Sequence, residues 1–216
     1  MIESFIKGFI VGMGASIPLG PMGVMCVQKT LGKGRNSGFI AGLGSSITDT
    51  LFAAIAIMGL AYMKKFIDYY ENYALLFGGF AVALIGLKIF LTNPVKQIRM
   101  PKGGKKHLQD FFSAIVMTIT NPGGVFLIIG MFAFVGMDVD TLSSGRVISF
   151  TLWGVFLGAS AWWFILSTAI NIFRNKFRLR QLLMINRISG IIIIALGLIS
   201  TSQGIWQFIS PYFLVK

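Results

Sequence analysis

Residues 39–62 read FIAGLGSSITDTLFAAIAIMGLAY, and this stretch decides the class of protein. It holds a single charged side chain, that of Asp49, in an otherwise apolar or weakly polar run. A helix needs about 20 mostly apolar residues to cross the hydrocarbon core of a bilayer. The stretch is therefore predicted to be a transmembrane helix.

Five further stretches pass the same test of length and apolar composition. Membrane β-strands are a poor alternative, because they alternate apolar and polar residues over about ten positions. We predict an all-α, polytopic membrane protein with six transmembrane helices in a single domain, residues 1–216. The five further stretches are residues 4–28, 73–91, 111–135, 147–173 and 188–209.

The overall composition supports a membrane protein. The 216 residues are 55% hydrophobic and 12% charged, whereas a soluble domain carries about a quarter charged residues. The net charge of +12 comes from Lys and Arg in short gaps between apolar runs. A nucleic-acid-binding domain would carry basic patches on a polar surface instead, so nucleic acid is excluded as a partner. Residues 1–14 lack the pattern of a removable signal and are expected to open the first span.

The basic residues predict the orientation, since Lys and Arg are enriched in cytoplasmic loops. The first, third and fifth gaps are basic, whereas the second and fourth are neutral or acidic. We therefore expect both termini in the periplasm and the basic gaps in the cytoplasm. The basic residues are Lys29, Lys33 and Arg35 in the first gap; Lys96, Arg99, Lys102, Lys105 and Lys106 in the third; and Arg174, Lys176, Arg178, Arg180 and Arg187 in the fifth.

An internal repeat divides the six spans into two sets of three. Residues 20–24, GPMGV, match residues 121–125, NPGGV, and the segment from Gly79 to residue 87 matches the one from Gly190 to residue 198. The repeats cover about 1–92 and 108–216, joined by a basic cytoplasmic linker at about 93–107. With three spans each, they enter the membrane with opposite polarity, which is the inverted repeat of many secondary transporters. Chance similarity between glycine-rich packing helices is the alternative.

Proline and glycine interrupt the first and fourth spans near the midplane. Proline removes a backbone donor and clashes with the preceding turn, and a glycine or asparagine before proline suits the start of a new helix. We predict that each of these spans is a pair of half-helices, whose exposed starts bind a carboxylate. Plain proline kinks are the alternative. The predicted substrate-binding residues are Gly20, Pro21, Met22, Gly23, Ser45, Ser46, Asn121, Pro122, Gly123 and Gly124.

Asp49 is the one acidic residue expected deep within a span. A charged aspartate at the centre of a membrane helix costs about 2.5–3.5 kcal/mol on insertion scales, so it needs a partner or a wet cavity. Ser45 and Ser46 share its helix face, as does Gly42. We predict that Asp49 is protonated and deprotonated during transport and serves as the proton-coupling residue. A hydrogen bond to a neighbouring helix is the alternative role.

Several other chemistries lack the residues that they require. Cys26 is the one cysteine, so no intramolecular disulfide is possible. An intramembrane aspartyl protease needs two carboxylates that share a proton, and His107 lies in a basic gap. We expect no enzyme activity, no metal site and no cofactor. Trp162 and Trp163 lie within a span, where pocket lining and plain packing both remain open.

The chain resembles the LysE-type translocators, the lysine/threonine exporter family. The resemblance rests on residues 18–24, PLGPMGV, on residues 30–35, TLGKGR, and on Gly38, residues 42–44 and Asp49. Residues 121–122, NP, and the Gly79 and Gly190 segments also fit that family. The resemblance implies a bacterial inner-membrane exporter of amino acids or close derivatives, energised by the proton gradient. It also implies functional roles for Gly20, Pro21, Asp49, Asn121 and Pro122.

Two departures from the family pattern leave the substrate open. Met22 and Gly23 follow residues 20–21 where many members have a polar residue nearby, and glycines follow Pro122 where a lysine is common. We expect a secondary active exporter, by proton antiport, of a small zwitterionic amino acid. An exporter of cations, metal ions or other small solutes is the alternative. The lipid bilayer is a partner, and a homo-oligomer is left open.

Overall fold

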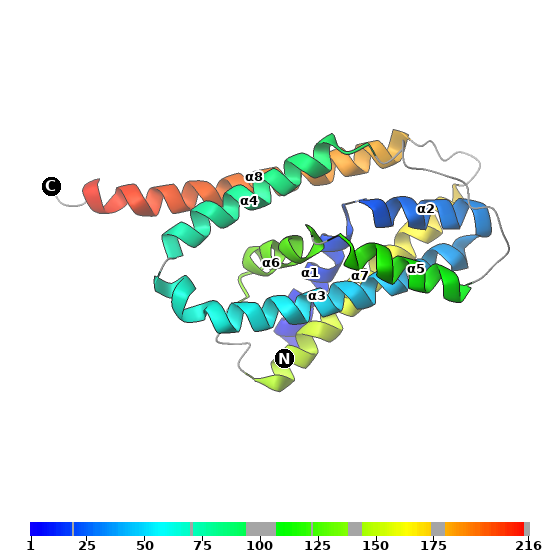
Figure 1. The fold of residues 1–216 in the computed structure, drawn as a ribbon, viewed down its shortest axis with the longest axis horizontal. Helices are drawn as coiled ribbons and strands as arrows, with labels where there is room; N and C mark the ends of the chain where they lie inside the picture. Colours follow the sequence, from blue (N-terminus) through cyan, green and yellow to red (C-terminus); the bar gives the residue numbers. More distant parts are fainter. Residues whose placement is uncertain are drawn as a thin grey trace.

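The structure is a computed structural model that describes residues 1–18, 20–69, 71–93, 107–121, 123–137, 144–173 and 180–213, without the side chains of 61–75, 180–182 and 207–213. These residues form eight α-helices and no strand (Figure 1). The all-α class predicted from the sequence is confirmed. The helices are α1 (Ile2–Ser16), α2 (Pro21–Lys33), α3 (Arg35–Tyr69), α4 (Glu71–Leu91), α5 (His107–Ile119), α6 (Gly123–Phe134), α7 (Gly145–Ile172) and α8 (Arg180–Phe213).

Several helices have the length and composition of membrane spans. Three qualify on their own within the described residues, namely Arg35–Leu60, Gly145–Ile172 and Leu183–Trp206. The α1–α2 and α5–α6 pairs each qualify when taken as one broken span, which gives up to five. The described apolar part of α4, Leu76–Leu91, is shorter than a span. The polytopic membrane class is therefore confirmed, while the number six stays a prediction.

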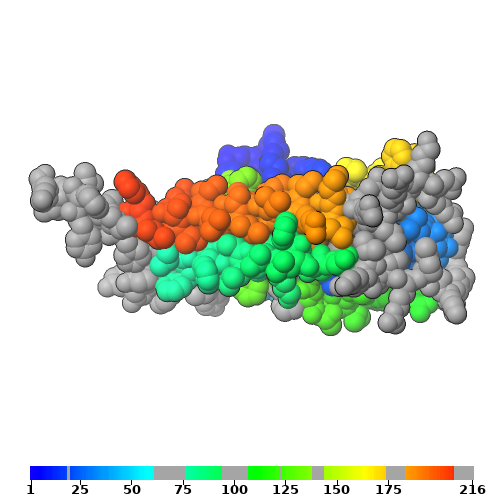
Figure 2. Space-filling model, turned by 90° about the horizontal axis from the view of Figure 1, so that it is seen from above, coloured from blue at the N-terminus to red at the C-terminus, as the bar shows by residue number. Residues whose placement is uncertain are grey.

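Helices α4 and α8 form an antiparallel pair along one side of the molecule (Figures 1 and 2). Glycines bring the two backbones together. A Cβ on Gly79 would lie 2.8 Å from the carbonyl oxygen of Gly197, and a Cβ on Gly86 would lie 3.0 Å from that of Gly190. Such close approach is how membrane helices gain packing energy, because lipid supplies no hydrophobic drive to associate.

Helices α1 and α7 pack in the same way. Gly8 and Gly12 of α1 face the carbonyl groups of Thr151 and Val155 in α7, and any Cβ on these glycines would clash with them. In return, two glycines of α7 face the backbone of α1. These are Gly154, against Phe5, and Gly158, against Phe9. A pair of small-xxx-small motifs thus joins the two helices face to face.

The interior contains two apolar clusters, one on each side of the helix breaks. The first joins α2 and α5 to α3 and α7, with Met22, Ala114 and the 2% exposed Trp163 among its members. The second joins α1 and α6 to the same two helices, with Phe52 and Phe132 among its members. Both breaks therefore lie between the two clusters. Trp163 belongs to the packed core, which favours the packing interpretation of this residue.

Candidate functional site

The first break separates α1 from α2 and bends the chain by 79°. Helix α1 ends at Ser16, and Gly20 adopts an extended conformation as the N-cap of α2. Pro21 occupies the first position of α2, where its missing N–H costs no hydrogen bond. The prediction that Gly20 and Pro21 start a second half-helix is confirmed.

The second break separates α5 from α6 and bends the chain by 75°. Helix α5 ends at Ile119, and the N–H of Asn121 donates to the Thr118 carbonyl at 3.0 Å. Helix α6 begins at Gly123, and the N–H of Gly124 donates to the Asn121 carbonyl at 3.2 Å. Pro122 lies outside the described residues. The fourth predicted span is therefore also two half-helices.

The two breaks lie next to one another. A Cβ atom placed on Gly20 would lie 3.9 Å from the side-chain amide nitrogen of Asn121. Pro21 and Asn121 are both exposed at this point, and Gly20 is partly exposed. The sequence motifs that match between the two halves are thus brought together in space.

Asp49 in α3 is linked to the helix ends at both breaks. Its Oδ2 accepts hydrogen bonds from the hydroxyl of Ser16 at 3.3 Å and from that of Ser45 at 3.5 Å. The hydroxyl of Thr118, near the end of α5, donates to Ser45 Oγ at 3.2 Å. These bonds are long and therefore weak. Asp49 as a whole residue is half-buried.

Ser16 and Thr118 were not among the residues predicted from the sequence. Ser16 is 4% exposed and Thr118 is 8% exposed, and each lies in the last turn of the half-helix that precedes a break. A signal for them exists in the sequence, because each is a hydroxyl residue two to four positions before a proline. Hydroxyl side chains close to a broken helix end can bond groups that the break leaves free.

Some predicted residues lie away from this contact region. The Ser46 hydroxyl is buried and donates to the Gly42 carbonyl of its own helix at 3.1 Å, not to Asp49. Met22 and Gly23 are buried, with Met22 in the first apolar cluster. The last two predicted glycines, Gly123 and Gly124, are partly exposed at the start of α6.

Asp110 is a second buried acidic residue, which the sequence pattern did not indicate. It precedes the fourth predicted span by one residue, but the structure buries it completely, in the first turn of α5. Its Oδ1 accepts hydrogen bonds from the ammonium groups of Lys29 and, at 3.0 Å, Lys33. The sequence could not reveal this, because the lysines are about 80 positions away along the chain.

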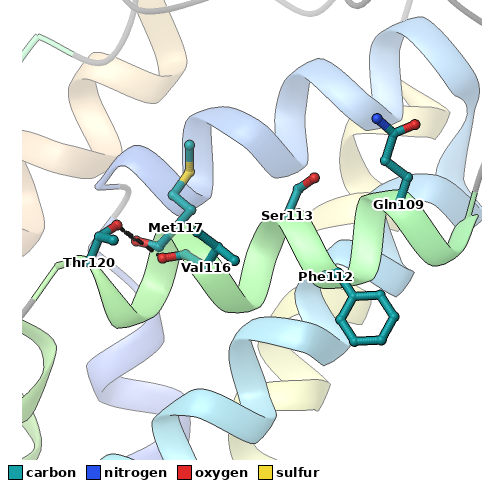
Figure 3. A pocket seen from close by; sticks show the side chains of 6 residues that line it. All are labelled: Gln109, Phe112, Ser113, Val116, Met117 and Thr120. Carbon is teal, nitrogen blue, oxygen red and sulfur yellow. Dashed lines mark hydrogen bonds between the residues drawn. The ribbon is translucent and has the colours of Figure 1, made fainter.

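One face of α5 lines an open groove of about 550 Å³ (Figure 3). Figure 3 shows the lining side chains spaced along the helix from its first turn to Thr120, the residue before Asn121. The Thr120 hydroxyl is satisfied by the carbonyl groups of Val116 and Met117, both at 3.0 Å. The groove therefore extends to the second break. Its lining residues are Gln109, Phe112, Ser113, Val116, Met117 and Thr120.

The chain is similar to a known family over most of its length. A family model described as LysE type translocator matches residues 13–203, which include both breaks, Asp49 and Asp110. The chain belongs to the LysE-type translocator family. It is therefore a membrane transporter and not an enzyme.

A curated relative of this translocator comes from Bacillus subtilis (strain 168). It is named "Putative amino acid efflux protein YcgF" and is 21% identical over 208 residues, which cover 95% of this chain and 98% of the relative. No solved structure gives a significant match. The translocator also has no group of three or more His, Cys, Asp or Glu placed to hold a metal ion within its described residues.

Proposed function

We propose that this translocator exports amino acids or close derivatives across the bacterial inner membrane, in exchange for protons. The family and the name of the curated relative support amino-acid efflux. The observation that carries the proposal is the link from Asp49 to the ends of α1 and α5, beside two adjacent helix breaks. A carboxylate beside two helix starts suits a zwitterion, which carries one charge of each sign.

In this mechanism the substrate carboxylate binds at the paired helix starts. In the first turn of α2, the N–H groups of Met22 and Gly23 have no partner inside the helix, and the start of each half-helix carries a partial positive charge. Gly20 and Asn121 bring these starts together, and the absence of a side chain on Gly20 leaves room for the anion. The open groove along α5 ends at Thr120, one residue before Asn121.

Asp49 binds either the substrate ammonium or a proton. When the site faces the cytoplasm, the ammonium displaces the proton and pairs with the carboxylate. After the site opens to the periplasm, a proton neutralises Asp49 and the substrate leaves. Because the hydrogen bonds from Ser16 and Ser45 are long, they hold the carboxylate without competing strongly for it.

The glycine contacts between α4 and α8 support an inverted repeat. The sequence motifs pair Gly79 with Gly190, and Gly86 with Gly197. A two-fold relation between the halves would exchange Gly79 with Gly190 and Gly86 with Gly197. If Gly79 approaches Gly197 under such a relation, Gly86 must also approach Gly190. Both approaches occur. Under this proposal the two halves rock about the site, both termini lie in the periplasm, and the α2–α3 corner lies in the cytoplasm.

Asp49→Asn tests the function, since the amide keeps the shape of a protonated carboxyl. We expect gradient-driven efflux from reconstituted vesicles to be lost, while the purified protein remains folded. Ser46→Ala is the matched control, because this hydroxyl bonds only its own helix, and it should export normally. Near-normal export by Asp49→Asn would show that the coupling scheme is wrong. Failure of the unmodified protein to export any amino acid in a radiolabelled panel would reject the proposed substrate class.

A further inference from the structure

A second pocket, lined by polar residues, lies at the corner between α2 and α3. Its volume is about 230 Å³, and Lys33, Gly34, Arg35, Asn36 and His107 line it. Gly34 forms the corner with a φ of 98°, a conformation that side chains other than glycine rarely adopt. None of these residues has a role in the export scheme.

The lysine of this pocket is held in place by a buried carboxylate. The Lys33 side chain is 7% exposed and donates to Asp110 Oδ1 at 3.0 Å. An ammonium group has three N–H donors, so this bond leaves two of them available. Lys29 bonds the same oxygen, and one carboxylate therefore neutralises only one of the two lysines. The cluster of Lys29, Lys33 and Asp110 therefore keeps a net positive charge although it is largely buried.

Arg35 adds a second fixed cation, and one of its donors is unpaired among the described residues. Its guanidinium lies 4.6 Å from the centre of the Phe164 ring, and this stacking orients it. Its Nε is buried and has no hydrogen-bond partner among the described residues. A buried donor without a partner costs free energy, commonly about 1–3 kcal/mol. An acceptor that entered the pocket would remove that cost.

The pocket continues directly onto an apolar surface. Phe164, the ring beneath Arg35, is 43% exposed, and Leu157 lies seven residues earlier on the same face of α7 and is 43% exposed. Trp153 extends this face by another turn. A cationic pocket at the end of a membrane helix, next to an exposed apolar face, matches the two parts of a phospholipid.

We propose that the α2–α3 corner binds the phosphate group of an anionic phospholipid. Lys33 and Arg35 contact the phosphate, and an acyl chain lies over Phe164 and Leu157. Basic pockets between membrane helices on the cytoplasmic side are known to hold anionic headgroups. A soluble phosphate would satisfy the cations but would make no use of the adjoining apolar face.

The experiment measures lipid binding by the full-length protein in detergent, by native mass spectrometry and by thermal melting. Phosphatidylglycerol, phosphatidylcholine and inorganic phosphate are added separately. We expect phosphatidylglycerol to bind in preference to phosphatidylcholine and to raise the melting temperature. Inorganic phosphate at the same concentration should do neither.

Two variants locate the site. Arg35→Gln removes one cation and should weaken phosphatidylglycerol binding about fivefold, the usual contribution of one basic residue at an anionic surface. Asn36→Asp places a negative charge on an exposed pocket residue and should weaken binding by at least as much. A negative charge near the start of a helix interacts favourably with the helix dipole. Asn36→Asp should therefore not destabilise the lipid-free protein. Its binding loss would then not be a folding defect.

Lys7→Gln is the matched control, because it removes one positive charge near the start of α1, where Lys7 bonds Glu3. It should bind phosphatidylglycerol as the unmodified protein does. Undiminished phosphatidylglycerol preference in both pocket variants would overturn the proposal, as would equal loss in Lys7→Gln. Stabilisation by inorganic phosphate equal to that by phosphatidylglycerol would show that the occupant is a soluble anion. None of these measurements depends on export.

Discussion

The hydroxyl of Ser16, the last residue of α1, donates a hydrogen bond to Asp49 Oδ2 at a distance of 3.3 Å. This contact joins a broken helix end to the acidic side chain that we assign to coupling. Any movement of α1 relative to α3 must change it. The bond therefore offers a direct way for the position of the helix break to influence the charge state of Asp49.

The first prediction concerns the hydroxyl groups around Asp49. Ser16→Ala and Ser45→Ala each remove one weak bond to the carboxylate, so transport should slow several-fold rather than stop. A hydrogen bond to a charged group contributes about 1.5–3 kcal/mol at normal length, and these bonds are longer. Initial efflux rates in vesicles measure the effect, with Ser46→Ala as the control. Equal rates for all three variants and the unmodified protein would show that these hydroxyl groups take no part in transport.

The second prediction concerns the buried cluster of Asp110. Asp110→Asn leaves Lys29 and Lys33 without a negative partner in a buried environment. Removing one partner of a buried ion pair typically costs about 3–5 kcal/mol, so a large fall in thermal stability is expected. Glu3→Gln breaks the pair with Lys7, in which Glu3 is 78% exposed, and should have almost no effect.

A triple replacement tests whether the loss of stability comes from the two unpaired lysine charges or from the loss of the Asp110 side chain itself. Asp110→Leu combined with Lys29→Met and Lys33→Met removes all three charges and should recover most of the stability, because apolar groups of similar volume often replace buried ions well. If Asp110→Asn alone melts like the unmodified protein, the cluster does not stabilise the fold. Melting of detergent-solubilised protein is the measurement in each case.

The third prediction tests the glycine packing between α1 and α7. A Cβ on Gly158 would collide with the backbone of Phe9, so Gly158→Ala must push the helices apart. Overpacking of this kind costs about 1–3 kcal/mol. Gly59→Ala is the matched control in α3, where, among the described residues, no atom beyond the neighbouring backbone of α3 itself lies within 4 Å of the new Cβ. It should leave stability unchanged or raise it by up to about 1 kcal/mol. Similar melting temperatures for the two variants would refute the close contact.

The fourth prediction is that the substrate is a neutral zwitterion rather than lysine or arginine. A dibasic substrate brings a second positive charge, which would need its own buried carboxylate. The structure supplies a second buried carboxylate in Asp110, but two lysines already bond it. We therefore expect threonine, leucine and similar amino acids to leave loaded vesicles faster than lysine does. Lysine efflux that outpaces theirs would contradict this prediction.

The sequence was sufficient to predict the class of fold and the positions of both breaks. Long apolar runs have few stable structures in lipid, because every backbone polar group must be bonded within the chain. Proline and glycine act on the backbone locally, so the starts of α2 and α6 could be predicted from residues 20–21 and 121–123. Asp49 stood out for the same local reason, as a costly charge within an apolar run.

Tertiary structure alone decided which distant residues meet. The approach of Gly20 to Asn121, the bond from Ser16 to Asp49 and the burial of Asp110 between two lysines all join separate helices. Hydrophobic patterning constrains which face of a helix is buried, but it does not specify the partner or the register of packing. Asp110 shows the difference most clearly: its neighbours in sequence place it at the edge of a span, whereas its neighbours in space bury it completely.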